Sequence, residues 1–261
     1  MVNDFDGKTA IVTGGGTGLG LEISTQLGRR GARIVCASRN AENHTELQAR
    51  GKSEGFEVES VTLDVRDASR VKEVVRGLER VDVLINNAAG NFIRPAMMLA
   101  PKAFATVLDI SLNGVFYMSR ECGRKMRESG GSIVNISAPY ASDGKPGVVH
   151  SACAKAGVES MTRTLAAEWV DYKIRVNAVS PGPFVSGGAA DRLWPSDDIE
   201  QKLLEDIPMH RFGSVAEIAK LVCYVASDEA SFMTGSVLVS DGGWTLPRPL
   251  VDLRKIDRRR K

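Results

Sequence analysis

The strongest indication of the fold is a glycine-rich stretch near the start of the chain, Thr13-Gly-Gly-Gly-Thr-Gly-Leu-Gly20. It follows an apolar run, 9–13, that is typical of a buried strand, and it leads into a helical pattern at 19–29. Glycines let a backbone approach a pyrophosphate closely, and a helix that begins there offers unpaired N–H groups and the positive end of its dipole. In this context the sequence predicts a dinucleotide-binding turn rather than a glycine-rich turn without ligand, and its contact residues are Gly14, Gly16, Thr17, Gly18, Leu19 and Gly20.

Short apolar runs alternate with longer helical patterns over all 261 residues. Strands that alternate with helices predict an α/β fold, with a doubly wound, seven-stranded parallel sheet that has helices on both faces. No stretch has the composition of an interdomain linker, so we expect one domain over 1–247, with an irregular insertion at 181–208 and a basic tail at 248–261. The predicted strands are 9–13, 33–37, 58–63, 81–86, 132–137, 174–179 and 236–240, and the predicted helices are 19–29, 42–52, 69–78, one within 101–127, 152–169 and 215–226.

The composition excludes several classes of protein. A formal net charge of +2 gives no strong attraction to nucleic acid or to a membrane surface. The four cysteines lie far apart, with no histidine at ligand spacing, which favours reduced thiols and no metal site. No apolar run is long enough to cross a membrane and no targeting segment is visible, so the sequence predicts a cytoplasmic protein without membrane insertion. The basic tail is either a solvated or disordered segment or a contact for an anionic ligand or a neighbouring subunit.

The end of the second strand distinguishes between the two nicotinamide dinucleotides. An acidic residue there would hold a ribose diol, but the chain has Ser38 and Arg39, and no acid occurs from 31 to 41. Arg39 can pair with a 2′-phosphate that an aspartate would repel, so the sequence predicts NADP(H) unless Arg39 is only a solvated charge. The neighbouring strand ends add further candidate cofactor contacts at the same sheet edge, namely Asp64, Val65, Asn87 and Ala88.

A second stretch carries the candidate chemistry: Ser-Ala-Pro-Tyr-Ala-Ser-Asp-Gly-Lys-Pro-Gly-Val-Val-His-Ser-Ala-Cys-Ala-Lys, residues 137–155. Its tyrosine, Tyr140, lies 15 residues before Lys155, so the two do not share a helical face. We therefore expect Tyr140 on a loop from which it reaches Lys155. Ser151 lies one helical turn before Lys155, where it could contact substrate or cap the helix.

Together these motifs resemble those of the short-chain dehydrogenase/reductase family. The landmarks occur in family order and are 13–20, 86–90, Asn113, Lys155, 175–182 and 241–243. The resemblance implies a single Rossmann domain, usually in a homotetramer, and a cofactor site that also includes Pro181, Gly182, Pro183 and Phe184. It further implies that Lys155 binds the nicotinamide ribose and that Asn113 holds a helix bulge and a water beside it.

The catalytic pattern departs from the usual form of that family. The usual tyrosine, four residues before the lysine, is replaced here by Ser151, and the usual serine is replaced by Ala138. The 2,4-dienoyl-CoA reductases share the displaced tyrosine, and this branch is also similar around 90–92, 148–161 and 180–184. The resemblance implies NADPH-dependent reduction of 2,4-dienoyl-CoA to 3-enoyl-CoA in β-oxidation of unsaturated fatty acids. The acyl-CoA would contact Arg66, Phe92, Ser151 and Arg192, under a lid at 183–208.

The chemistry of that reaction requires hydrogen-bond donors at one place. Hydride adds at the far end of the conjugated system, and negative charge collects on the thioester oxygen, where fixed donors stabilise it. The sequence predicts that Tyr140, Asn91 and Ser151 are these donors, and that Tyr140, or a water that it orders, supplies the final proton.

Two other functions remain open at this point. The chain could be another NADP-dependent reductase of the same family that acts on a ketone or enone with Tyr140 as the acid. It could also be a non-catalytic NADP-binding subunit, since the usual serine and tyrosine are lost. Among single residues, Tyr140 could be surface packing, Asn91 could be a turn residue, and His150 is expected to be structural rather than a base.

Overall fold

The computed structural model describes residues 4–186 and 197–247. Within them, seven parallel strands form one sheet in the order β3-β2-β1-β4-β5-β6-β9, which confirms the predicted α/β fold. The chain winds outward from β1 in both directions, so a crevice opens between β1 and β4 at the carboxyl edge of the sheet. The strands are β1 (Thr9–Thr13), β2 (Arg33–Ser38), β3 (Val58–Thr62), β4 (Val83–Asn86), β5 (Gly131–Ile136), β6 (Ile174–Pro181) and β9 (Val237–Ser240).

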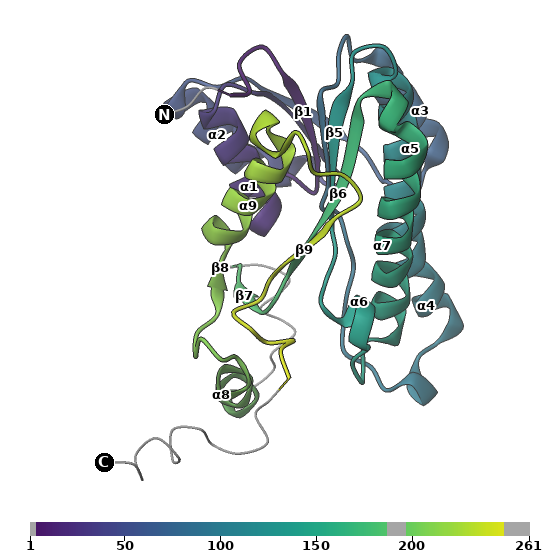
Figure 1. The fold of residues 1–261 in the computed structure, drawn as a ribbon, viewed down its shortest axis with the longest axis vertical. Coiled ribbons are helices and arrows are strands. Elements are labelled where there is room, and N and C mark those ends of the chain that lie inside the picture. Colours follow the sequence, from purple (N-terminus) through teal and green to yellow (C-terminus); the bar gives the residue numbers. More distant parts are fainter. Residues whose placement is uncertain (1–3, 187–196, 248–261) are drawn as a thin grey trace.

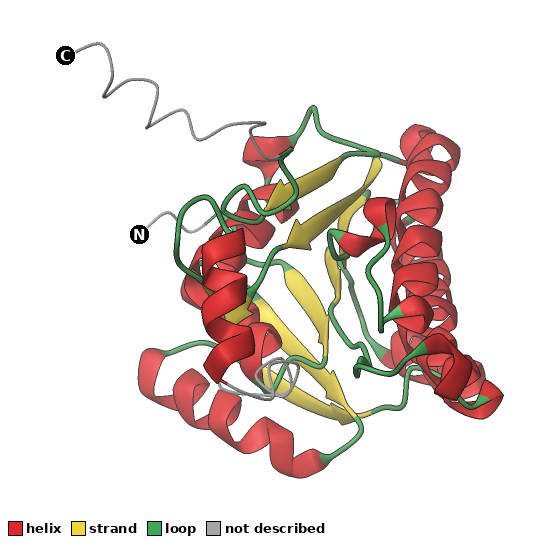
Figure 2. Ribbon diagram, turned by 90° about the horizontal axis from the view of Figure 1, so that it is seen from below, coloured by secondary structure: helices red, strands yellow, loops and turns green. Residues whose placement is uncertain are grey.

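Helices cover both faces of this sheet (Figure 1). One layer holds α1 (Gly18–Arg29), α2 (Thr45–Glu54) and α9 (Val215–Ala226), and the other holds α3 (Ala68–Gly77), α5 (Gly114–Met126) and α7 (Val149–Trp169). Figure 2 shows the strands between these two layers. At the carboxyl edge, α4 (Pro101–Leu108) continues through a π-helical turn, Asp109–Asn113, directly into α5.

Successive residues of a strand point to opposite faces of the sheet, so each helical layer packs on a different set of strand side chains. In β1, Ala10 and Val12 belong to the apolar core beneath α1 and α9, whereas Ile11 belongs to the core beneath α3, α5 and α7. All three side chains are fully buried, as a central parallel strand requires. Each helical layer therefore has its own apolar core, and the polar groups of the strand ends are left at the crevice.

Three expectations about local structure are wrong. Tyr140 does not lie on a loop but begins a short helix, α6 (Tyr140–Asp143). Helix α7 begins at Val149 and not at residue 152, and its N-cap residue is Val148, so Ser151 is not an N-cap. The predicted helix 42–52 is divided, because a 3-10 turn at Ala41–His44 precedes α2.

The insertion predicted to be irregular contains regular structure. It holds α8 (Asp197–Asp206) and the strand β7 (Phe184–Val185), which pairs in parallel with β8 (Gly213–Ser214). Among the described residues, no helix is both long enough and apolar enough to cross a membrane. The tail 248–261 and residues 187–196 of the predicted lid lie outside the described residues.

Candidate functional site

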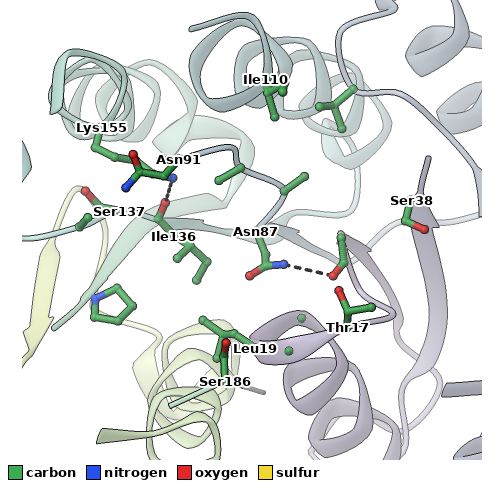
Figure 3. Close-up of a pocket in the computed structure, with 18 of the residues that line it drawn as sticks. Thr17, Leu19, Ser38, Asn87, Asn91, Ile110, Ile136, Ser137, Lys155 and Ser186 are labelled. Atoms are coloured by element: carbon green, nitrogen blue, oxygen red, sulfur yellow. Dashed lines mark hydrogen bonds between the residues drawn. The ribbon is translucent and has the colours of Figure 1, made fainter. Parts of the chain in front are cut away.

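A cavity of about 490 Å³ opens at the carboxyl edge of the sheet, where the winding direction changes. Its walls come from the β1–α1 turn, the ends of β2, β4, β5 and β6, and the first half of α7. Figure 3 shows Lys155 and Ser38 at opposite ends of it, with Thr17 and Leu19 between them along one side. The cavity therefore has the place expected of a dinucleotide site.

The turn after β1 fits a pyrophosphate. Gly14 has φ +64° and Gly18 has φ +51°, a backbone conformation that favours glycine. A side chain at Gly20 would place its Cβ only 2.1 Å from the carbonyl oxygen of Gly14, so no larger residue fits there. Helix α1 has no side-chain cap and no acidic residue in its first turn, which leaves its N-terminal N–H groups available to an anion.

Hydrogen bonds of Asn87 connect the turn after β1 to the end of β4. Its side-chain Nδ2 donates to the carbonyl oxygens of Thr13, at 3.0 Å, and Gly14, at 3.2 Å. The hydroxyl of Thr13 accepts from the backbone N–H groups of Asn87 and Ala88 at 3.0 Å. These bonds fix the two strand ends that flank the crevice, so the cavity is preformed.

The end of β2 supplies the cationic end of the cavity. Ser38 and Arg39 line it, and Asp64 is the one acidic residue among the described residues that line it. Asp64 is neutralised, since Arg66 Nη2 lies 2.5 Å from Asp64 Oδ2 and this bond lowers the pKa of the Asp64 carboxyl. Arg39 adds to that lowering through its charge, so no free carboxylate opposes a phosphate at this end.

Lys155 occupies the other end of the cavity. Its ammonium group is buried, and burial lowers the pKa of Lys155 to about 8. Nζ donates to the carbonyl oxygen of Ile136 at 2.5 Å, the one hydrogen bond of this group within the described part of the chain. An ammonium group has three donors, so Lys155 keeps capacity for a hydroxyl-bearing ligand such as a ribose.

Tyr140 lines the cavity and has polar partners on two sides. Asn91 Nδ2 donates to the phenolic oxygen at 3.2 Å, and Ser151 Oγ lies 3.1 Å from the same oxygen. The backbone N–H of Phe92 donates to Asn91 Oδ1 at 2.9 Å, which fixes the amide with its nitrogen toward the tyrosine. Burial raises the pKa of Tyr140, and the bond with Ser151 opposes that shift.

This arrangement orients the phenolic proton. When Ser151 donates to Tyr140, the phenolic oxygen accepts two hydrogen bonds, from Ser151 and from Asn91, and its own proton is free for an acceptor in the cavity. Two donors on one oxygen also stabilise the phenolate that remains after the proton leaves. The three side chains can thus serve as one unit that delivers a hydrogen bond, or a proton, to an oxygen of a bound substrate.

His150 lies behind this unit. The side chain is fully buried, and its ring stacks on Phe92 with centroids 4.3 Å apart. Neither ring nitrogen has a hydrogen-bond partner of good geometry in the described residues. Burial lowers the pKa of His150, and the nearby backbone of Phe92 offsets part of that lowering. The ring is neutral at pH 7 and supports the loop that carries Asn91.

Asn113 lies in the π-helical turn, away from the cavity lining. Its Nδ2 donates to Asp109 Oδ1 at 2.8 Å. The π-helical turn contacts α7, where Leu112 fills the space above Gly157. The π-helical turn is the helix bulge expected at Asn113, and the role of Asn113 in holding a water beside Lys155 stays a prediction.

The structure does not bring every predicted residue to the cavity. Gly16 does not line it, because its Cα faces the carbonyl oxygen of Asn43, and a Cβ there would lie 1.9 Å from that oxygen. Three other predicted residues also lie outside the lining: Arg66, Phe92 and Asn113. Ser151 does not line the cavity either, but its hydroxyl contacts the hydroxyl of the lining residue Tyr140. Arg192 lies outside the described residues. The remaining predicted cofactor residues all line the cavity: Gly14, Thr17, Gly18, Leu19, Gly20, Ser38, Arg39, Asp64, Val65, Asn87, Ala88, Lys155, Pro181, Gly182, Pro183 and Phe184.

Sequence reasoning missed several lining residues. Asn40, Asn43 and Trp244 line the cavity, and Lys145 Nζ lies 4.8 Å from the centroid of the Trp244 ring. Lys145 and Trp244 lie far apart in the sequence, so no local pattern predicts their contact. Asn40 and Asn43 closely follow the end of a strand, and this position was a signal that they could line the cavity. Within 4–186 and 197–247, no group of three or more histidine, cysteine or acidic residues could hold a metal ion.

Known proteins resemble this chain over nearly its whole length. A family model described as enoyl-(acyl carrier protein) reductase matches residues 14–245. A Bacillus subtilis protein named "Probable 2,4-dienoyl-CoA reductase", (2E)-enoyl-CoA-producing, is 40% identical over 93% of this chain and 98% of its own. A zebrafish (Danio rerio) peroxisomal 2,4-dienoyl-CoA reductase, (3E)-enoyl-CoA-producing, is 41% identical over 90% of this chain and 81% of its own. The crystal structure of a gluconate 5-dehydrogenase from Burkholderia cenocepacia, in complex with NADP and tartrate, has TM-score 0.88 and 28% identity, and covers 93% of this chain and 97% of its own.

Proposed function

This chain belongs to the short-chain dehydrogenase/reductase family of oxidoreductases, and from that premise we propose that it reduces 2,4-dienoyl-CoA thioesters to 3-enoyl-CoA with NADPH. The observation that carries the proposal is the hydroxyl of Tyr140, held by Asn91 and Ser151 at the cavity wall. Ser151 stands where an ordinary ketone reductase of the family has its tyrosine. The two relatives quoted above bear the name of this activity, although they differ in the product named.

The family supports a nicotinamide cofactor, and the choice of NADPH is part of the proposal. Ser38 and Arg39 would hold the 2′-phosphate, and Asp64, the one acidic residue in the described lining, is already paired. The amides at the start of α1 would hold the pyrophosphate, and Lys155 the nicotinamide ribose. NADPH, when bound, supplies the hydride.

The chain's own residues would stabilise the charge that this transfer creates on the substrate. Electron density moves along the diene to the thioester oxygen, which then needs donors at hydrogen-bond distance. Tyr140 would donate a hydrogen bond to that oxygen and keep its proton, while Asn91 and Ser151 hold the phenolic oxygen in place. Protonation at carbon by Tyr140, or by a water bound to it, completes a 3-enoyl thioester.

Phe92 and Arg66 are further proposed contacts of the substrate. Phe92 is exposed beside Asn91, where it could meet the acyl chain. Arg66 would bind a phosphate of coenzyme A while its guanidinium group stays paired with the Asp64 carboxylate. Three other parts of the proposal remain predictions: the substrate contact of Arg192, the lid 183–208 and the domain boundary at 247. A cytoplasmic location is also a prediction, and it agrees with the free thiols of all four cysteines.

A homotetramer is also part of the proposal. Among the described residues, β9 is an edge strand of the sheet, with Val239 exposed on it, and Phe232 and Tyr224 are exposed nearby along the chain. Exposed apolar residues next to an open strand edge favour contact with another copy. Sedimentation equilibrium should give four times the monomer mass of 28.1 kDa, and a monomer would contradict this part of the proposal.

The substrate proposal is tested by one assay with product analysis. The protein is incubated with NADPH and either a 2,4-dienoyl-CoA or a 3-ketoacyl-CoA of equal chain length. We expect nicotinamide absorbance to fall with the dienoyl-CoA, and mass spectrometry and NMR to identify a 3-enoyl-CoA. Faster turnover of the ketoacyl-CoA would favour another reductase of the family, and a 2-enoyl product would contradict the proposed site of protonation.

A further inference from the structure

The 3-10 turn Ala41–His44 packs against the end of β2 and brings a buried histidine to the proposed 2′-phosphate site. The side chain of His44 is 2% exposed, and its Nε2 lies 2.6 Å from Ser38 Oγ. Ser38 lines the cavity, whereas His44 does not. His44 is therefore a buried titratable side chain whose described hydrogen bond is made to a candidate cofactor-binding hydroxyl.

The bonds around Ser38 assign the proton on His44. Ser38 Oγ also lies 3.1 Å from the carbonyl oxygen of Asn40, which can only accept. A serine hydroxyl has one proton, so both contacts are hydrogen bonds only if Ser38 donates to Asn40 and His44 Nε2–H donates to Ser38. Burial lowers the pKa of His44, so the ring is neutral at pH 7 with a single N–H. These bonds place that hydrogen on Nε2.

The turn leaves the Ser38 hydroxyl free to change acceptor. The carbonyl oxygen of Asn40 also accepts from the backbone N–H of Asn43, at 3.1 Å, so it keeps a partner when the hydroxyl turns away. His44 Nε2–H can continue to donate to Ser38 Oγ throughout. A donor behind a hydroxyl polarises it and strengthens the bond that it donates in turn.

We propose that His44 is a specificity-determining positioning residue, which orients Ser38 to donate its hydroxyl proton to the 2′-phosphate of NADPH. This inference rests on the proposed cofactor and adds a residue that does not itself touch it. Arg39 supplies charge at the same end of the cavity, and the His44–Ser38 pair supplies a directed hydrogen bond. NADH has a hydroxyl in place of the phosphate and gains little from that bond.

Binding measurements test this without turnover. Dissociation constants of NADPH, NADH, adenosine 2′,5′-bisphosphate and 5′-AMP are measured by calorimetry for wild type, Ser38→Ala and His44→Phe. The phenylalanine fills the buried space without a donor, and His44→Met is a more flexible replacement if His44→Phe does not fold. His44→Gln restores a donor near the position of Nε2.

We expect His44→Phe to weaken NADPH and the bisphosphate about tenfold, with changes below about twofold for NADH and 5′-AMP. His44→Gln should recover most of the loss, and His44→Phe should add nothing in the Ser38→Ala background. Equal losses for NADPH and NADH would reduce His44 to a structural role and overturn the inference. Unchanged NADPH binding in both donor-free variants would overturn it as well.

The failure of the underlying cofactor proposal gives a different result. If wild type binds NADPH and NADH equally, and Arg39→Ala changes neither, the preference for NADPH is itself wrong. If wild type prefers NADPH and Arg39→Ala removes that preference while His44→Phe keeps it, only the role of His44 is wrong.

Discussion

Replacement of Lys155 by methionine should stabilise the protein without cofactor at neutral pH. The ammonium group is buried and has one hydrogen-bond partner, the carbonyl oxygen of Ile136, among the described residues. Burial lowers its pKa from 10.5 to about 8, which corresponds to roughly 3 kcal/mol of folding free energy. Methionine removes that cost but leaves the Ile136 carbonyl without its donor, so we expect a net gain of about 2 kcal/mol at pH 7.

The pH dependence gives the sign of this effect. Below about pH 8, Lys155 is charged in both the folded and the unfolded chain, so the folded state bears the full cost of burial. Between about 8 and 10.5 the folded protein releases a proton that the unfolded chain retains, so the stability of wild type rises with pH through this window. The difference between Lys155→Met and wild type should therefore be largest below pH 8 and shrink toward pH 10.

Urea unfolding of both proteins at several pH values between 7 and 10 measures this difference, and Lys52→Met, at an exposed position in α2, is the matched control. The control should show no such trend. A Lys155→Met protein that is less stable than wild type at pH 7, or a stability difference that does not change with pH, would show that burial of the Lys155 ammonium group does not destabilise the folded state. Saturating cofactor should reverse the order of stability, since only wild type keeps the ammonium group.

Three further predictions concern the neighbourhood of the site. His150→Phe keeps an aromatic ring in the stack and removes two buried nitrogens that have no hydrogen-bond partner in the described residues, so thermal unfolding should show a gain of about 1 kcal/mol, and a loss would mean that those nitrogens have partners. Asn91→Ala removes a donor from Tyr140 and should lower kcat about 100-fold with little change in cofactor affinity, whereas an unchanged kcat would exclude Asn91 from the reaction. Gly16→Ala forces a Cβ against the carbonyl oxygen of Asn43 and should cost about 1–3 kcal/mol in urea unfolding, while an unchanged midpoint would show that the turn can shift.

The architecture could be predicted because local signals agree with the global fold. Apolar runs bounded by glycine or polar residues located all seven strands of the sheet to within about two residues at each end. The glycine-rich turn located the start of α1, since glycine adopts the positive φ of Gly14 and Gly18 without strain. These signals depend only on neighbours in sequence.

The site was harder to predict where it depends on tertiary contact. The start of α7 lacks a side-chain cap, so Val149 and His150 gave no local sign that the helix includes them. Tyr140 begins a helix of four residues, too short for a hydrophobic period to reveal. His44 was overlooked because its partner, Ser38, belongs to the preceding strand, and only the 3-10 turn between them brings the two side chains together.

The displaced tyrosine illustrates the same limit. Its spacing from Lys155 identified Tyr140 as the candidate acid, but the sequence left Ser151 equally open as a cap and Asn91 as a turn residue. The structure brings both side chains to the phenolic oxygen, at 3.1 Å and 3.2 Å. Neither contact has a sequence signature, because the three residues lie on separate elements.

The most direct test of the account compares wild type with Tyr140→Phe in NADPH-dependent reduction of a 2,4-dienoyl-CoA. Phenylalanine keeps the ring and removes the hydroxyl that Asn91 and Ser151 hold, so we expect a loss in kcat of about 100-fold or more, with NADPH affinity unchanged. Dienoyl-CoA turnover that is indifferent to Tyr140→Phe would contradict the account and point to Ser151 as the donor.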